Sequence, residues 1–221
     1  MPSQRMAKAC MLSVLLLLAG SANVLYPAES SSGAPEYARD STVLVKAADS
    51  YEHALQIWKT PEDINAWIAA NFVYDRARAV RLSETQRAKN GPVSIYPPAE
   101  FFTTKTGVCV DLSRFGVETL RRIDQQSQPQ YLMIEFDPIQ VTGNTLRLHW
   151  LASFTRDGKR YFFADSTRPG QIAGPYNDTG EFIDEYAQYR GRRIVAFREL
   201  ESYQKQRRPQ TLKRQALAKK P

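Results

Sequence analysis

Residues 145–155 carry the pattern that most restricts the fold of this chain. Apolar side chains alternate there with a second set that is mostly polar. This alternation predicts a β-strand with the two sets on opposite faces of a sheet. Turn sequences lie on both sides of this strand, at residues 141–144 and at Asp157-Gly158, so strands at 131–136 and 160–164 are predicted to pair with it antiparallel. The apolar set is Leu146, Leu148, Trp150, Ala152 and Phe154, and the opposite set is Arg147, His149, Leu151 and Ser153.

The segments before these strands have helical periodicity. Residues 41–58 fit a helix, and Thr60-Pro61 supplies a capping side chain and a first-turn proline for a second helix that is predicted to continue to about Val80. Residues 83–98 are polar and then rich in proline, which predicts a loop. A late helix over 179–190 completes an α+β fold, with N-terminal helices packed on an antiparallel β-sheet.

The N-terminus predicts export. Arg5 and Lys8 precede an apolar run at 11–19, followed by small residues, as in a secretory signal peptide over residues 1–28. The run is shorter than the roughly 20 residues of a transmembrane helix, although an uncleaved membrane anchor is the alternative. We therefore expect a periplasmic or secreted protein, with a linker at 29–40 and one domain at 41–200.

Residues 201–221 are predicted to form a basic, disordered tail. The chain has a net charge of +7, and its C-terminal basic residues are Lys205, Arg207, Arg208, Lys213, Arg214, Lys219 and Lys220. This tail allows a weak contact with an anionic surface. No aromatic residue lies between the charges after Tyr203, so no specific nucleic-acid partner is expected.

The cysteines exclude a disulfide framework. The chain has two cysteines, and Cys10 lies in the predicted signal, which leaves Cys109 as the one thiol of the exported protein. An unpaired cysteine in an oxidising compartment indicates a free reactive thiol or an intermolecular bridge. With one such thiol and two histidines the sequence offers no zinc-ligand spacing, and neither a metal nor a cofactor is expected.

Three residues form a candidate nucleophilic site. Cys109 is predicted to open a helix, where free N–H groups and the helix dipole favour a thiolate with a lowered pKa. His149 is a candidate base, because it points away from the apolar face of its strand. Asp165 follows the next strand and could orient the imidazole. The other histidine, His53, is given no role.

The hairpin register decides whether His149 meets Asp165. A two-residue loop at Asp157-Gly158 places His149 opposite Ser166. A three-residue loop at 156–158, with Gly158 at positive φ in a bulge, places His149 opposite Asp165. Because the candidate triad requires the second arrangement, we predict the bulged loop.

These motifs resemble those of the transglutaminase-like superfamily. Residues 107–113 resemble its nucleophile motif, and Leu148-His149-Trp150 and residues 161–167 resemble its histidine and aspartate strands. The resemblance covers roughly residues 60–170, with a mild departure at Ser113-Arg114-Phe115. It implies a papain-like α+β core with Cys109 as nucleophile, His149 as base and Asp165 as orienting residue.

The resemblance implies acyl transfer on an amide of a protein or peptide. Hydrolysis by a cysteine peptidase or amidase is the preferred activity, because water needs no acceptor site. The alternatives are a protein-glutamine transglutaminase and a non-catalytic binding or scaffold module of the same fold. The backbone N–H of Cys109 is the expected oxyanion donor. The resemblance also allows an aromatic donor near Tyr74, which otherwise is an ordinary helix residue.

Overall fold

The computed structural model describes residues 45–204, so the predicted signal peptide, the linker and residues 205–221 of the tail lie outside the described part. The centre of the domain is a five-stranded antiparallel sheet in the order β6-β5-β4-β3-β7. Its strands are β3 (Gln130–Val141), β4 (Asn144–Arg156), β5 (Lys159–Phe163), β6 (Ala173–Tyr176) and β7 (Ile194–Leu200). The predicted α+β class is confirmed.

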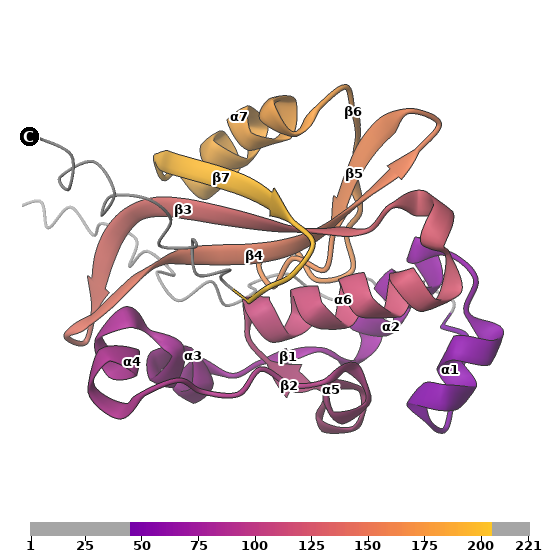
Figure 1. The fold of residues 1–221 in the computed structure, drawn as a ribbon, viewed down its shortest axis with the longest axis horizontal. Coiled ribbons are helices and arrows are strands. Elements are labelled where there is room, and N and C mark those ends of the chain that lie inside the picture. The colour runs from indigo at the N-terminus through magenta and orange to yellow at the C-terminus, as the bar shows by residue number, and fades with distance from the viewer. Residues whose placement is uncertain (1–44, 205–221) are drawn as a thin grey trace, which may run out of the picture.

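Helices cover both faces of this sheet (Figure 1). One face carries α7 (Thr179–Arg190), whose bounds agree with the sequence prediction. The other helices lie on the opposite side: α1 (Tyr51–Ile57), α2 (Pro61–Asn71), α3 (Arg76–Leu82), α4 (Glu84–Asn90), α5 (Pro98–Thr104) and α6 (Cys109–Ile123), which a 3₁₀ turn η1 (Gln125–Ser127) follows. Within residues 45–204, no helix has the length and apolar character needed to cross a membrane.

Strand β4 therefore lies between two hydrophobic cores. Trp150, Ala152 and Phe154 belong to the core under α6, together with aromatic side chains from α1, α2 and α5. Leu151 belongs to a second core under α7, together with Phe182. The alternation predicted from the sequence is correct, but α7 buries the second face of the strand as well.

Gly116 allows α6 to lie very close to the sheet. A Cβ atom at this position would be 2.8 Å from the Cβ of Ala164 and 3.3 Å from the Cβ of Ala152. Both distances are shorter than ordinary contacts between carbon atoms. The missing side chain thus brings the helix that begins at Cys109 against β4 and against the segment that follows β5.

The helix predicted to run to Val80 is wrong. α2 ends at Asn71 because the next residues form β1 (Val73–Tyr74), which pairs in parallel with β2 (Thr106–Gly107). The side chain of Asp75 then caps a new helix by accepting a hydrogen bond from the N–H of Arg78 at 2.8 Å. The helical periodicity of the sequence continues from α2 into α3. It therefore could not reveal that the residues between them pair with β2, about 30 positions later.

The loop predicted over residues 83–98 is also wrong in its first half. Ser83 caps α4 by accepting a hydrogen bond from the N–H of Gln86 at 3.2 Å, and the helix ends before Gly91. No residue of α4 is buried, so the segment has no apolar face that periodicity could detect. The capping serine was the signal available in the sequence.

The hairpin between β4 and β5 has a two-residue turn. Arg156 pairs with Lys159, and the turn residues Asp157 and Gly158 have φ values of 51° and 70°. Positive φ at both positions is the type I′ arrangement, whose twist matches that of the flanking strands. The predicted three-residue bulged loop is therefore wrong, although the positive φ of Gly158 is confirmed.

The packed body of the domain extends past the predicted boundary at residue 200. The ring of Tyr203 lies 5.9 Å from that of Tyr131, and the Arg114 guanidinium lies 4.8 Å from the Tyr203 ring centroid. Arg121 binds Glu201 at 3.0 Å. Residues 201–204 thus belong to the folded domain rather than to the tail.

Replacing Gly158 tests the hairpin turn. Gly158→Ala should destabilise the protein by about 1 kcal/mol, because alanine is strained at positive φ, and no atom lies within 4 Å of the added methyl group. Gly158→Asn is the matched control and should lose less, since asparagine tolerates this conformation. Urea unfolding followed by circular dichroism measures both. Equal losses for the two variants would contradict this account.

Candidate active site

The carboxylate of Asp111 fixes the start of α6. It is completely buried and accepts hydrogen bonds from the backbone N–H groups of Val108 at 3.0 Å and Tyr96 at 2.9 Å. Arg78, which is also buried, binds both carboxylate oxygens, at 2.7 and 2.8 Å. These bonds tie α3 and the segment before α5 to the first turn of α6, and they set Cys109 as its first residue.

The sequence analysis missed the pairing of Arg78 with Asp111. The two residues are 33 positions apart and lie on different helices, so no local pattern links them. A bidentate arginine–carboxylate pair in a buried site is strongly directional. Four hydrogen bonds already occupy the carboxylate of Asp111, so the role of this pair is structural.

Cys109 is half-buried at the N-terminus of α6. Burial raises the pKa of its thiol to about 12. The backbone N–H groups of Trp150 and Val110 act in the opposite direction, and the negative charge of Asp111 adds to the increase. Burial therefore opposes the thiolate expected from the helix terminus, and it acts more strongly than the N–H groups.

His149 and Asp165 are in direct contact. The distance between His149 Nε2 and Asp165 Oδ1 is 2.9 Å, and both side chains are buried. The predicted contact is present although the register pairs Ser153 with Phe162, which by extension places Ser166 opposite His149. β5 ends at Phe163, and Ala164 has a φ of 52°, which turns the chain out of the strand and places Asp165 against the imidazole.

Asp165 is held by donors on both oxygens. Oδ1 also accepts from the N–H and the hydroxyl of Thr167, each at 2.8 Å, and Oδ2 accepts from the hydroxyl of Tyr186 at 2.9 Å. Burial acts to raise the pKa of this carboxyl, but the bonds from His149 and Thr167 and the charge of Arg168 outweigh it, so the pKa lies below its usual range. Asp165 is thus ionised, and its carboxylate accepts a hydrogen bond from His149.

This bond determines which nitrogen of His149 is basic. Because Nε2 donates to the carboxylate, Nδ1 is the nitrogen left without a proton in the neutral ring. Burial lowers the pKa of His149, and the bond to Asp165 offsets this only in part. The ring also stacks on Tyr186, with centroids 6.0 Å apart and planes 18° apart. His149 is therefore an oriented imidazole whose neutral form is favoured by burial.

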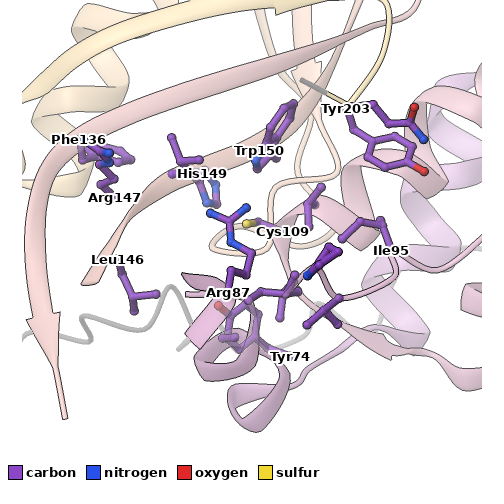
Figure 2. A pocket seen from close by; sticks show the side chains of 18 of the residues that line it. Tyr74, Arg87, Ile95, Cys109, Phe136, Leu146, Arg147, His149, Trp150 and Tyr203 are labelled. Atoms are coloured by element: carbon purple, nitrogen blue, oxygen red, sulfur yellow. The ribbon is translucent and has the colours of Figure 1, made fainter. Parts of the chain in front are cut away.

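Cys109 and His149 line the same cavity, which has a volume of about 360 Å³ (Figure 2). The close-up shows both side chains among the residues that line the pocket. Tyr74 lines the cavity too, and burial raises the pKa of its phenol, so it remains a hydrogen-bond donor. Between residues 45 and 204, no group of three histidine, cysteine or acidic side chains is arranged to hold a metal ion.

Comparison with known proteins identifies the family to which this chain belongs. A family model described as Transglutaminase-like domain matches residues 44–192, about two thirds of the chain. A search of curated proteins finds no match. The matched range contains all three residues of the candidate triad and ends just after α7.

The pH dependence of alkylation distinguishes a neutral pair from an ion pair. A thiol pKa raised to about 12 leaves very little thiolate at pH 7, so alkylation of Cys109 by iodoacetamide should be slower than that of a free thiol and should rise only in the alkaline range. The rate is measured by intact-protein mass spectrometry between pH 5 and pH 10, on the scale of a free-thiol pKa of about 8.5. A rise below pH 7 would instead show the lowered thiol pKa that the sequence analysis expects.

Tyr186 tests the support of Asp165. Tyr186→Phe removes the hydroxyl that binds Oδ2 at 2.9 Å and should destabilise the protein by about 1–3 kcal/mol, because a buried carboxylate oxygen loses a donor. Tyr189→Phe is the control, since that hydroxyl donates to the Thr167 carbonyl in a part-buried position. Because the pKa of Asp165 is depressed in the folded state, the loss should be full above about pH 4 and shrink below it. Equal losses in denaturant unfolding would count against the role of Tyr186.

Proposed function

Because the chain belongs to the transglutaminase-like domain family, we propose that it is a cysteine hydrolase that cleaves an amide of a protein or peptide through a thioester on Cys109. One observation carries the proposal: the 2.9 Å bond between His149 Nε2 and Asp165 Oδ1 beside Cys109 in a shared cavity. A nucleophile, a base and an orienting acid are the parts that such catalysis needs.

Acylation begins from the neutral pair. The Cys109 sulfur attacks the amide carbonyl carbon while its proton passes to Nδ1 of His149. Asp165 stabilises the imidazolium that forms. The tetrahedral intermediate then collapses, the C–N bond breaks, and His149 gives the proton to the leaving amine. Coupling the proton transfer to the attack avoids a buried thiolate in the resting enzyme, in keeping with the raised pKa of the thiol.

Deacylation uses the same base. A water molecule gives a proton to Nδ1 of His149 and attacks the thioester carbonyl, after which the C–S bond breaks and the thiol regains its proton. The product is a carboxylic acid. An amine in place of water would give a new amide, which is the transglutaminase alternative.

The oxyanion has two candidate donors. The backbone N–H of Cys109 lies at the free N-terminus of α6. The phenol of Tyr74 lines the same cavity as Cys109, and burial raises its pKa, so it keeps its proton. We assign the backbone N–H as the main donor and Tyr74 as a second one.

The site of action belongs to the proposal as well. The apolar run at 11–19 and the basic residues before it support export. The substrate would then be a protein or peptide outside the cytoplasm. The basic residues after Gln204 would add at most a weak contact with an anionic surface, and nucleic acid is not a proposed partner.

The two histidines provide the matched test. The purified protein is incubated with a defined peptide mixture in water labelled with oxygen-18. Mass spectrometry then detects the label in newly formed carboxyl groups. Cys109→Ala and His149→Ala should abolish turnover, by at least about 10³-fold. His53→Ala should retain it, because His53 lies on α1 with its side chain 41% exposed and is 3.9 Å from Asp49. Turnover that persists in Cys109→Ala would refute the proposal.

The acceptor is tested in the same assay. Addition of a small primary amine should leave the heavy-oxygen product dominant. A dominant amine adduct that depends on Cys109 would show a transglutaminase. Specific peptide binding without any turnover would show a binding module of the same fold.

A further inference from the structure

Arginine side chains surround the candidate nucleophile. Arg87 from α4, Arg147 from β4, and Arg190 and Arg192 from the end of α7 and the residues after it line the cavity that holds Cys109. Among the lining residues between positions 45 and 204, there is no aspartate or glutamate. The charged part of the wall that these residues form is therefore cationic.

These arginines differ in how far their charge is already neutralised. Arg147 lies between Glu84 and Glu135, at 2.5 and 3.2 Å, and so brings little net charge. Arg190 donates to the hydroxyl of Tyr186 at 3.2 Å, which is a neutral acceptor. Arg190 thus keeps a cationic group beside the triad.

Arg190 and Arg192 also share an apolar support. Their guanidinium groups lie 5.4 and 4.6 Å from the ring centroid of Phe136. Stacking of this kind holds a guanidinium plane in place, and Arg192 is held further by a hydrogen bond that it donates to the backbone carbonyl of Asp137 at 2.7 Å. The part of the cavity wall formed by Arg190 and Arg192 therefore carries positive charge in a fixed position, which favours an anion.

Arg87 is the arginine most available for a ligand. It is exposed, and no carboxylate between residues 45 and 204 lies within ion-pair distance of its guanidinium. Its side chain extends into the pocket toward Cys109 and His149 (Figure 2). A guanidinium without a partner, near a reacting thiol, is suited to bind a carboxylate through two parallel hydrogen bonds.

Resting on the amide hydrolysis proposed above, we infer that the enzyme selects acidic peptides, with Arg87 binding a carboxylate next to the scissile amide. Arg190 and Arg192 add to the positive field of the same pocket. The rest of the lining is largely apolar, including Val93, Ile95 and Leu146, and would contact the carbon chain that carries the acid. Arg87 is thus a specificity-determining residue.

Two peptide chloromethyl ketones that differ in one group test the inference. One carries glutamate and the other glutamine next to the reactive ketone, so the pair differs only in charge. Each forms an S–C bond to Cys109 as chloride leaves. The second-order rate of modification is measured by intact-protein mass spectrometry for the wild-type protein, Arg87→Gln and Arg81→Gln. Arg81 is the matched control, because it is exposed on the neighbouring α3 and does not line the cavity.

The wild-type protein should react about tenfold faster with the glutamate reagent, the effect of roughly one charge-assisted contact. The ratio should fall to near 1 in Arg87→Gln, persist in Arg81→Gln, and decrease at high ionic strength because the site is open to solvent. A ratio near 1 in the wild type, or a ratio unchanged in Arg87→Gln, would overturn the inference.

The same measurement separates this inference from the proposed function. If both reagents modify Cys109 rapidly and at equal rates, and His149→Ala slows both, the hydrolase proposal stands and the charge selection fails. If neither reagent modifies Cys109 faster than iodoacetamide does, and His149→Ala changes nothing, both fail.

Discussion

The buried carboxylate of Asp111 is the constraint on which the rest of the site depends. A charge removed from water must be compensated by hydrogen bonds and an opposite charge, and here the donors are two backbone N–H groups and both arms of Arg78. Because these donors come from three separate segments, satisfying one carboxylate positions all of them. α6 begins at Cys109 as a result, and Cys109 and Val110 of its first turn line the cavity.

β4 joins the two halves of the molecule. Trp150 faces the core under α6, while the neighbouring His149 faces the layer under α7, where Tyr186 stacks on its ring. The imidazole therefore receives its orientation from one side of the sheet, and the cavity that it serves lies where the N-terminus of α6 meets the same strand. Burial also raises the pKa of Cys109 and lowers that of His149, so it favours the neutral form of each side chain.

The contact between His149 and Asp165 shows how a correct residue assignment can rest on an incorrect geometry. The predicted contact required a bulge at the hairpin, but the turn has two residues, as its Asp157-Gly158 sequence favours. The correction occurs at the other end of the strand, where Ala164 adopts a left-handed conformation. Alanine is not a residue that signals such a conformation in sequence. In this conformation Ala164 packs closely against Gly116 of α6.

The sequence by itself determined the features that depend on neighbouring residues. These include the alternation of β4, the turn at Asp157-Gly158, the bounds of α7 and the start of the Cys109 helix, since periodicity, capping and turn chemistry act over a few positions. Only the tertiary structure decided the features that depend on distant partners. It ended α2 through the β1–β2 pairing, paired Arg78 with Asp111, and desolvated the half-buried Cys109 enough to raise the pKa of its thiol rather than lower it. Desolvation and long-range pairing are properties of the assembled fold, and no local pattern encodes them.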